Sequence, residues 1–300
     1  MLTQTILRRD WRSLLNAARP KTLTAAVAPV SVASFLAMNQ GFDVDWILSV
    51  YALLSSFCIQ IGTNLTNDAF DFKKGADTEK RIGPERITQK GILTFNQVLF
   101  AAALFFGLSV LFAVPLIVKG GVIVAGTLAV SILAGYMYTA GPFPLGYKGL
   151  GEVFVLLFFG IIATSVFYYI LTAGFSLLSC LAGIQIGLHC TVMIAINNIR
   201  DRIGDAKVGK NTLAVRFGEN FAKNEIAFLL YAPFFMGVFW LLIGQPVAAI
   251  LPCVILFPTY RFEKTIRNTP IGPIYNTFLA KGAFLHFSFA LLLSLALLIN

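Results

Sequence analysis

Two clusters of asparagine and aspartate stand where long apolar segments run into basic loops. The first reads Asn64-Leu-Thr-Asn67-Asp68-Ala-Phe-Asp71 and the second reads Asn197-Asn198-Ile-Arg-Asp201-Arg-Ile-Gly-Asp205. On a helix, steps of three and four residues return to the same side, so each cluster places polar side chains on one face. Such oxygen atoms suit Mg²⁺, which uses one or two carboxylates and shares phosphate oxygens of a bound substrate. The clusters therefore predict a site for Mg²⁺ and a diphosphate.

A structural explanation competes with this prediction. A single aspartate at a helix end often pairs with a nearby Lys or Arg and only holds a loop in place. Two matched clusters favour a functional role, because an acidic side chain at the centre of a membrane helix costs roughly 2.5–3.5 kcal/mol on insertion scales. The residues expected to be catalytic are Asp71, Asp201 and Asp205.

The composition indicates what kind of chain must position these clusters. Hydrophobic residues make up 57% of the 300 residues, charged residues make up 12%, and the mean hydropathy is +0.79. These values lie outside the range of soluble domains and indicate an integral membrane protein. We expect one transmembrane domain over residues 1–300, with residues 1–21 as a cytoplasmic N-terminal segment and no cleaved signal peptide.

The order of apolar segments predicts an all-α bundle of nine transmembrane helices around a central cavity. The expected spans are 22–38, 46–66, 96–118, 121–139, 150–173, 175–199, 225–244, 246–260 and 281–299. The span at 246–260 contains Pro252 and Pro258 and is expected to be kinked.

Charge distribution predicts the orientation of the bundle. If the nine spans alternate, all of the 23 Lys and Arg residues except Lys119 fall on the side of the N-terminus. Positive charge concentrates in cytoplasmic loops, so both acidic clusters are expected on the cytoplasmic side of the cell membrane, in a bacterium the inner membrane. Because the basic residues are spread over several loops beside the bilayer, the net charge of +9 does not indicate a nucleic-acid partner. No obligate protein partner is evident.

A polyprenyl diphosphate fits this arrangement, because its anionic head and apolar tail need polar residues at the mouth of an apolar, lipid-accessible groove. Carboxylates repel the diphosphate, so a cation must bridge them. The bound cation and nearby Lys or Arg would stabilise charge on the departing diphosphate. An electron-rich aromatic ring could then attack the allylic carbocation, while apolar walls exclude water.

The clusters also carry a resemblance. The segment from Gln60 to Asp77 is similar to the first Asp-rich motif of the UbiA superfamily of intramembrane prenyltransferases, and the segment from Asn197 to Gly218 is similar to the second. Ala18-Arg19-Pro20-Lys21-Thr22-Leu23 and the stretch from Tyr138 to Glu152 support the likeness, which extends from about residue 17 to the C-terminus. Within the superfamily the chain most resembles the 1,4-dihydroxy-2-naphthoate polyprenyltransferases.

This resemblance implies an activity and a set of site residues. The reaction would transfer a polyprenyl group to 1,4-dihydroxy-2-naphthoate with loss of CO₂ and diphosphate, giving a precursor of the menaquinone type. The implied Mg²⁺ ligands are Asn67, Asp71, Asp77, Asn198, Asp201 and Asp205. The residues expected to bind substrate are Asn64, Asp68, Lys74, Arg81, Arg86, Tyr138, Asn197 and Lys210.

Two alternatives remain open from the sequence. The acceptor could be another aromatic compound, such as 4-hydroxybenzoate or homogentisate. The intramembrane acids could also belong to an ion-coupled transporter, although transporters place coupling sites near the midplane of the bilayer. The family's motifs for the cation are more specific than its motifs for the acceptor. Ala69 departs from the first motif, where an aromatic residue is common.

Overall fold

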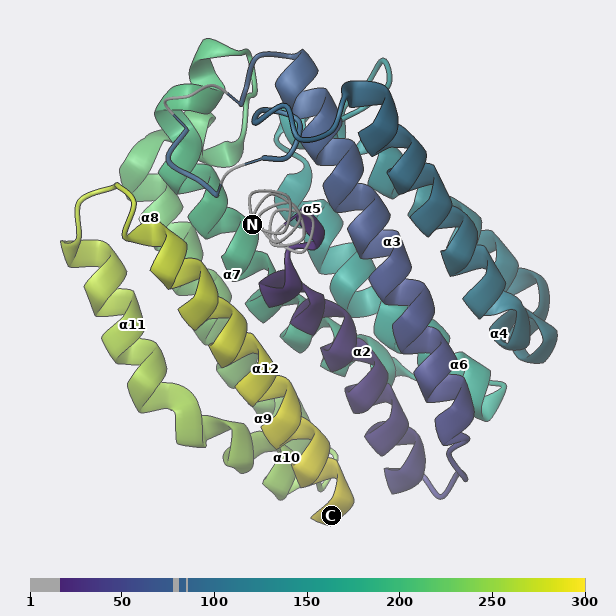
Figure 1. The fold of residues 1–300 in the computed structure, drawn as a ribbon. Helices are drawn as coiled ribbons and strands as arrows, with labels where there is room; N and C mark the ends of the chain where they lie inside the picture. The colour runs from purple at the N-terminus through teal and green to yellow at the C-terminus, as the bar shows by residue number, and fades with distance from the viewer. Residues whose placement is uncertain (1–16, 78–80, 85, 300) are drawn as a thin grey trace, which may run out of the picture.

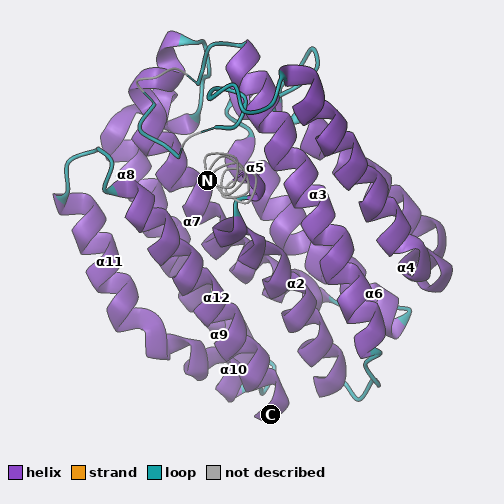
Figure 2. Ribbon diagram, in the orientation of Figure 1, coloured by secondary structure: helices purple, strands orange, loops and turns teal. Residues whose placement is uncertain are grey.

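The computed structural model describes residues 17–77, 81–84 and 86–299, and all regular elements within these ranges are helical. Most of the segment expected at 1–21 lies outside the described residues. The helices form one bundle whose long loops gather at one end (Figures 1 and 2). The elements in chain order are α2 (Pro20–Asn39), α3 (Trp46–Lys73), α4 (Phe95–Met137), η1 (Leu145–Lys148), α5 (Gly151–Leu156), η2 (Leu157–Ile162), α6 (Ala163–Thr172), α7 (Leu177–Lys207), α8 (Leu213–Phe235), α9 (Gly237–Leu242), α10 (Pro246–Ile250), η3 (Leu251–Ile255), α11 (Leu256–Asn268) and α12 (Tyr275–Ile299).

Local sequence explains where the long helices begin. The Asp45 carboxylate accepts a hydrogen bond from the backbone N–H of Ile47 and so caps α3. Thr94 and Gln97 form a capping box at the start of α4. The Ser176 hydroxyl oxygen accepts from the backbone N–H of Leu178 and caps α7, and the Thr212 hydroxyl oxygen caps α8 in the same way. Side-chain oxygens at these positions satisfy backbone donors that have no partner within the helix.

The described chain contains fewer separate membrane-crossing helices than the nine spans expected from the sequence. Seven helical segments in the described chain are long and apolar enough to cross a membrane, and Leu23–Asn39 is a shorter apolar one. The difference arises in α4, which joins the two spans expected at 96–118 and 121–139. The prediction of a polytopic, all-α membrane bundle is confirmed.

Helix α4 is not straight, and its break explains the difference. Gly121 has φ 64° and ψ −148°, which is not helical and which residues with a Cβ rarely adopt. A Cβ at Gly62 of α3 would meet Phe106 of α4. A Cβ at Gly135 of α4 would meet Thr63, the residue that follows Gly62 in α3. Two distant positions of α4 therefore lie at the same level of α3, so the chain folds back at Gly121 into two antiparallel arms.

The segment 246–268 is broken as expected. Pro252 lies in the short 3-10 turn η3, between α10 and α11. Pro258 lies within the first turn of α11, where the missing N–H needs no helical partner.

Close backbone contact positions α7, the helix that carries the second cluster. A Cβ built on Gly160 of η2 would lie 2.4 Å from the carbonyl oxygen of Gly183 and 2.6 Å from the Cα of Gly187. Small residues four apart let membrane helices approach closely and gain van der Waals contact. Helix α7 is therefore held tightly against the α5–η2–α6 segment, and most of its middle is buried.

Candidate active site

The first cluster lies at the end of α3 and is almost fully buried. Asn64, Asn67, Asp68 and Asp71 are each at most 8% exposed. The Asp71 Oδ1 accepts a hydrogen bond of 2.9 Å from the hydroxyl of Tyr147, and its Oδ2 lies 3.6 Å from the guanidinium of Arg86. The aspartate therefore faces a hydroxyl and a positive charge supplied by two different loops.

Asp68 has a different set of partners. Its Oδ2 accepts from the backbone N–H of Ile87 at 3.1 Å, and its Oδ1 accepts from the N–H and hydroxyl of Thr88 at 3.1 and 2.5 Å. The carboxylate thus holds the loop that follows α3. Its expected contact with substrate stays a prediction, and the structure gives it a positioning role.

Asp77 lies in the loop beyond α3 and pairs with two arginines. It forms an ion pair with Arg81, and its Oδ2 lies 3.3 Å from Nε of Arg86 without hydrogen-bond alignment. Burial raises the pKa of Asp77 to about 6 despite the opposing charge of Arg81, and the Asp71 carboxylate adds to the rise. Arg86 therefore connects Asp71 with Asp77.

The second cluster lies at the end of α7. Arg200 donates to both oxygens of Asp201, at 2.8 and 2.6 Å. The Asn198 amide donates to Oε1 of Glu152 at 2.6 Å. Asp205 lies 3.5 Å from Nζ of Lys210, and its Oδ2 is buried without a hydrogen-bond partner within the described residues.

The two clusters meet around Tyr147, which is 6% exposed. Nζ of Lys74, from the first motif, lies 4.1 Å from the centre of the Tyr147 ring, and Nζ of Lys210, from the second motif, lies 5.7 Å from it. Burial would lower the pKa of Lys210, but the carboxylates of Asp71, Asp205 and Asp201 outweigh burial and raise it. Lys210 therefore interacts electrostatically with acids of both motifs, and the two clusters lie at the same end of the bundle.

The other basic residues expected near a diphosphate are also placed here. Lys74 donates to the carbonyl of Thr139 at 2.6 Å, and burial lowers the pKa of its ammonium. Arg81 also donates to the carbonyl of Pro84. Burial, followed by the Asp71 carboxylate, raises the pKa of Tyr147 and keeps its hydroxyl protonated as a donor.

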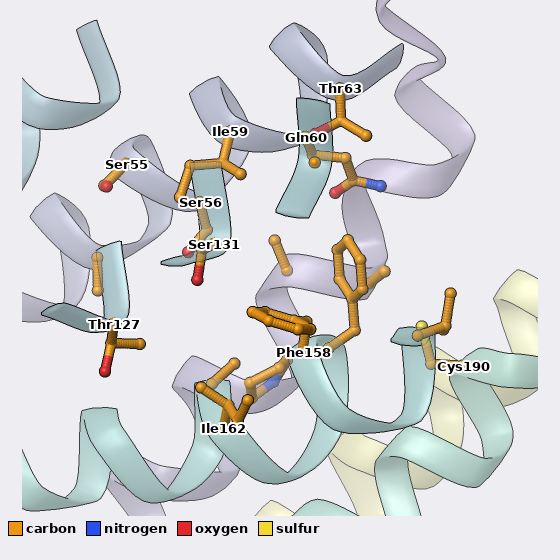
Figure 3. A pocket seen from close by; sticks show the side chains of 18 of the residues that line it. Ser55, Ser56, Ile59, Gln60, Thr63, Thr127, Ser131, Phe158, Ile162 and Cys190 are labelled. Atoms are coloured by element: carbon orange, nitrogen blue, oxygen red, sulfur yellow. The ribbon is translucent and has the colours of Figure 1, made fainter. Parts of the chain in front are cut away.

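An apolar cavity of about 290 Å³ opens beneath the clusters (Figure 3). Asn64, Asn67, Asn197 and Tyr138 line its polar part. Figure 3 shows α3 side chains such as Ser56 and Ile59 on one side and Phe158 and Ile162 on the other. The lining extends along α3 back to Ala52, about 22 Å from Asn67 at 1.5 Å per residue. The cavity can receive a long apolar group whose polar end meets the asparagines.

The donors fit a hard cation, although they are not assembled as a ready metal cage. Among the residues that the structure describes, no group of three or more His, Cys, Asp or Glu side chains is arranged to hold a metal ion. Arginines and lysines pair with the acids instead. The oxygen-only donor set and the unpartnered, buried Oδ2 of Asp205 nevertheless match the preference of Mg²⁺.

Comparison with known proteins identifies the family. The model of the UbiA prenyltransferase family matches residues 26–268. The chain belongs to the UbiA prenyltransferase family. It is therefore an integral membrane enzyme of the prenyltransferase class, and the resemblance read from the two motifs is confirmed.

Curated relatives and solved structures agree with this membership. The chain is 37% identical over 227 residues to the 1,4-dihydroxy-2-naphthoate octaprenyltransferase of Haemophilus influenzae, covering 73% of each chain. It is 37% identical over 224 residues to the enzyme of the same name from Escherichia coli, covering 72% of each. Its fold is similar to that of a UbiA homolog from Archaeoglobus fulgidus bound to DMAPP and Mg²⁺, with a TM-score of 0.68, 17% identity and coverage of 96% of this chain and 99% of the other.

Several side chains of this family member complete the site without having been assigned a role from the sequence. They are Thr139, Glu152, Arg200 and Asn276. Tyr147 lies in the loop that the resemblance places near the acceptor, and it donates to Asp71. Thr139, Tyr147 and Glu152 lie in the stretch that supported the resemblance, so the motif itself pointed to them. Asn276 lies at the start of α12, outside both motifs, and had no such indication.

Proposed function

We propose that this enzyme transfers a polyprenyl group from polyprenyl diphosphate to 1,4-dihydroxy-2-naphthoate, with loss of CO₂ and diphosphate. The acceptor is supported by the relatives from Haemophilus influenzae and Escherichia coli, which are named 1,4-dihydroxy-2-naphthoate octaprenyltransferases. One geometric observation carries the proposal: acids and lysines of two motifs meet at the polar end of an apolar cavity.

The diphosphate binds between the two motifs. The residues that would hold Mg²⁺ are Asn67, Asp71 and Asp77 on one side, and Asn198, Asp201 and Asp205 on the other. The bound cation supplies Lewis-acid stabilisation of the negative charge on the diphosphate. The Mg²⁺ named with the similar archaeal fold supports this assignment.

Basic side chains complete the binding of the head group. Lys74, Arg81, Arg86 and Lys210 stand within the same end of the bundle and contact the diphosphate oxygens. Asp71 and Asp77 both pair with Arg86, so this arginine lies beside the acids that would hold the cation and can reach the diphosphate oxygens. Asn64 and Asn197 line the cavity next to this site, and Asp68 holds the adjacent loop at Ile87 and Thr88.

The apolar cavity protects the reacting carbon. Cleavage of the carbon–oxygen bond leaves the electron pair on the diphosphate and positive charge on the allylic carbon. Phe154 and Phe158, stacked with ring centroids 4.3 Å apart, and Tyr138 line the cavity and exclude water, and their π faces favour the cation. The electron-rich ring of the acceptor then forms the new carbon–carbon bond, and its carboxylate leaves as CO₂, so that the electron pair of the broken carbon–carbon bond restores the aromatic ring.

The enzyme works at the cytoplasmic face of the cell membrane. The described loop residues 74–77, 81–84, 86–94, 139–149 and 208–212 carry basic side chains and lie at the same end of the bundle as the acid clusters. The excess of Lys and Arg supports a cytoplasmic position for that end.

An acceptor panel tests the proposal. Purified protein with MgCl₂ and geranylgeranyl diphosphate is supplied with 1,4-dihydroxy-2-naphthoate, 4-hydroxybenzoate or homogentisate, and prenylated products are measured by mass spectrometry. A naphthoate labelled in its carboxyl group reports CO₂ release. We expect product only with the naphthoate, and omission of Mg²⁺ should abolish it. Turnover with 4-hydroxybenzoate and none with the naphthoate would overturn the acceptor.

A further inference from the structure

Glu152 is a buried carboxylate that neither acidic motif contains. It is the second residue of α5 and is 5% exposed. Its Oε1 accepts a hydrogen bond from Nδ2 of Asn198 at 2.6 Å, whereas its Oε2 is buried without a partner within the described residues. Leaving a buried polar atom unpaired costs stability, so this glutamate is poorly explained as a packing residue.

The chemistry of the two groups fixes how Asn198 is turned. An ionised carboxylate only accepts hydrogen bonds, whereas an amide has a donating NH₂ and an accepting oxygen. In the structure Glu152 accepts from the NH₂ end of Asn198, and while it is ionised it cannot bind the oxygen end. The amide oxygen must point away from Glu152, where it is available to another ligand.

We propose that Glu152 is a positioning residue, which presents Oδ1 of Asn198 to the cation. This inference rests on the proposed function, because it assumes that Asn198 is a ligand. Side chains that orient metal ligands contribute strongly to metal affinity, and their loss typically weakens it by about 10–100-fold.

The corresponding asparagine of the first motif is held differently. The Thr139 hydroxyl donates to Oδ1 of Asn67 at 2.8 Å. A hydroxyl can donate or accept, so Thr139 permits either orientation of that amide, whereas Glu152 permits one. Thr139 lies just after α4 and Glu152 in the first turn of α5, so both contacts come from the stretch that joins these helices and enters α5. This stretch of chain therefore contacts the asparagine amides of both motifs, and Glu152 is the residue that determines which way its amide points.

The decisive comparison uses two substitutions of Glu152. Glu152→Gln keeps an oxygen that accepts from the Asn198 amide and removes the charge, whereas Glu152→Leu removes the acceptor at similar size. The readout is the dissociation constant of Mn²⁺, measured by electron paramagnetic resonance with geranylgeranyl diphosphate present and no acceptor. We expect Glu152→Leu to weaken Mn²⁺ binding by about tenfold. Glu152→Gln can still accept from the Asn198 amide but can also donate to its oxygen, so it should lose less Mn²⁺ affinity than Glu152→Leu.

Gln185→Leu is the matched control. Gln185 is a buried polar residue of α7, the helix that carries Asn198. It donates to the carbonyl of Pro233 at 2.8 Å, away from the clusters. This substitution should lower the melting temperature and leave Mn²⁺ binding unchanged. If Glu152→Leu does not purify as a folded protein, Glu152→Met takes its place.

A double-mutant cycle separates orientation from other roles. If Glu152 acts through Asn198, Glu152→Leu should add no further loss of Mn²⁺ affinity to Asn198→Ala. Equal losses in Glu152→Gln and Glu152→Leu would overturn the proposal, since they would assign the effect to charge. Unchanged binding in both would also overturn it. Because the titration needs no aromatic acceptor, a wrong acceptor would fail in the acceptor panel alone.

Discussion

At the scale of single residues, adjacent acids of one helix face perform different tasks. Asp68 uses both oxygens to hold the backbone at Ile87 and Thr88, whereas Asp71 faces Tyr147 and Arg86. Asp201 likewise receives both of its hydrogen bonds from one side chain, Arg200. A carboxylate whose partners are side chains can exchange them for a cation by rotamer changes, whereas one that binds backbone groups cannot do so without moving a loop.

The removal of single charges tests the two motifs. Asp71→Asn and Asp201→Asn keep the shape of the side chain and remove the negative charge that attracts the cation. We expect each to lower turnover by at least about tenfold, which corresponds to about 1.4 kcal/mol in the barrier. Turnover is followed by product formation, and the melting temperature reports folding. Asp43→Asn, in an exposed turn, is the control. Unchanged rates in both motif variants would return these aspartates to a structural role.

At the scale of elements, one connection does most of the alignment. The stretch from the end of α4 into the first turn of α5 supplies Thr139 to Asn67, Tyr147 to Asp71 and Glu152 to Asn198. Its backbone carbonyl at Tyr147 also accepts from the N–H of Asn211 at 3.0 Å, beyond α7. The two helices that carry the motifs are thus held by a third piece of chain, which must itself be fixed.

The glycine contact beneath this connection provides a test. Gly160→Ala adds a Cβ that would lie 2.4 Å from the carbonyl oxygen of Gly183, and backbone cannot yield as a side chain can. We expect a loss of about 1–3 kcal/mol in stability, as for other overpacked sites, and weaker turnover because α7 is displaced. The melting temperature in detergent measures the first effect. Gly126→Ala, in the second arm of α4 with no atom near its added Cβ, should leave the melting temperature unchanged. Equal melting temperatures for the two variants would contradict the proposed packing.

At the scale of the whole molecule, both acid clusters lie at one end of the bundle. Within the described residues, the loops at that end carry Lys74, Arg81, Arg86, Lys90, Lys148 and Lys210, whereas the opposite end has short connections such as the one around Asp43. The fold-back of α4 at Gly121 is necessary for this arrangement, because it returns Tyr138 and Thr139 to the level of Asn67.

Cysteine labelling of spheroplasts tests the orientation. Asp43→Cys and Lys148→Cys place thiols at exposed positions of opposite ends. A membrane-impermeant maleimide should label Asp43→Cys in intact spheroplasts and Lys148→Cys only after lysis. The unsubstituted enzyme, with its four native cysteines, is the background control. Labelling of Lys148→Cys in intact spheroplasts would show that the proposed orientation is wrong.

The amino-acid sequence determined the class of the protein, most of its helices and the two clusters. Long apolar segments must become helices in a bilayer, because no water is present there to satisfy the backbone. The spacing of Asn67 and Asp71, or of Asn198, Asp201 and Asp205, then sets a common face by helical geometry alone. These features depend on residues close in the chain, and so they were predictable.

The tertiary structure decided which partners each acid has. Arg86 reaches back to Asp71, Arg200 reaches Asn276 across 76 positions, and Glu152 meets Asn198 across 46. Such contacts depend on how helices pack and where α4 reverses, and helical spacing contains no information about either. The direction in which the Asn198 amide points is therefore a property of the folded bundle, because it is imposed by a carboxylate from another helix.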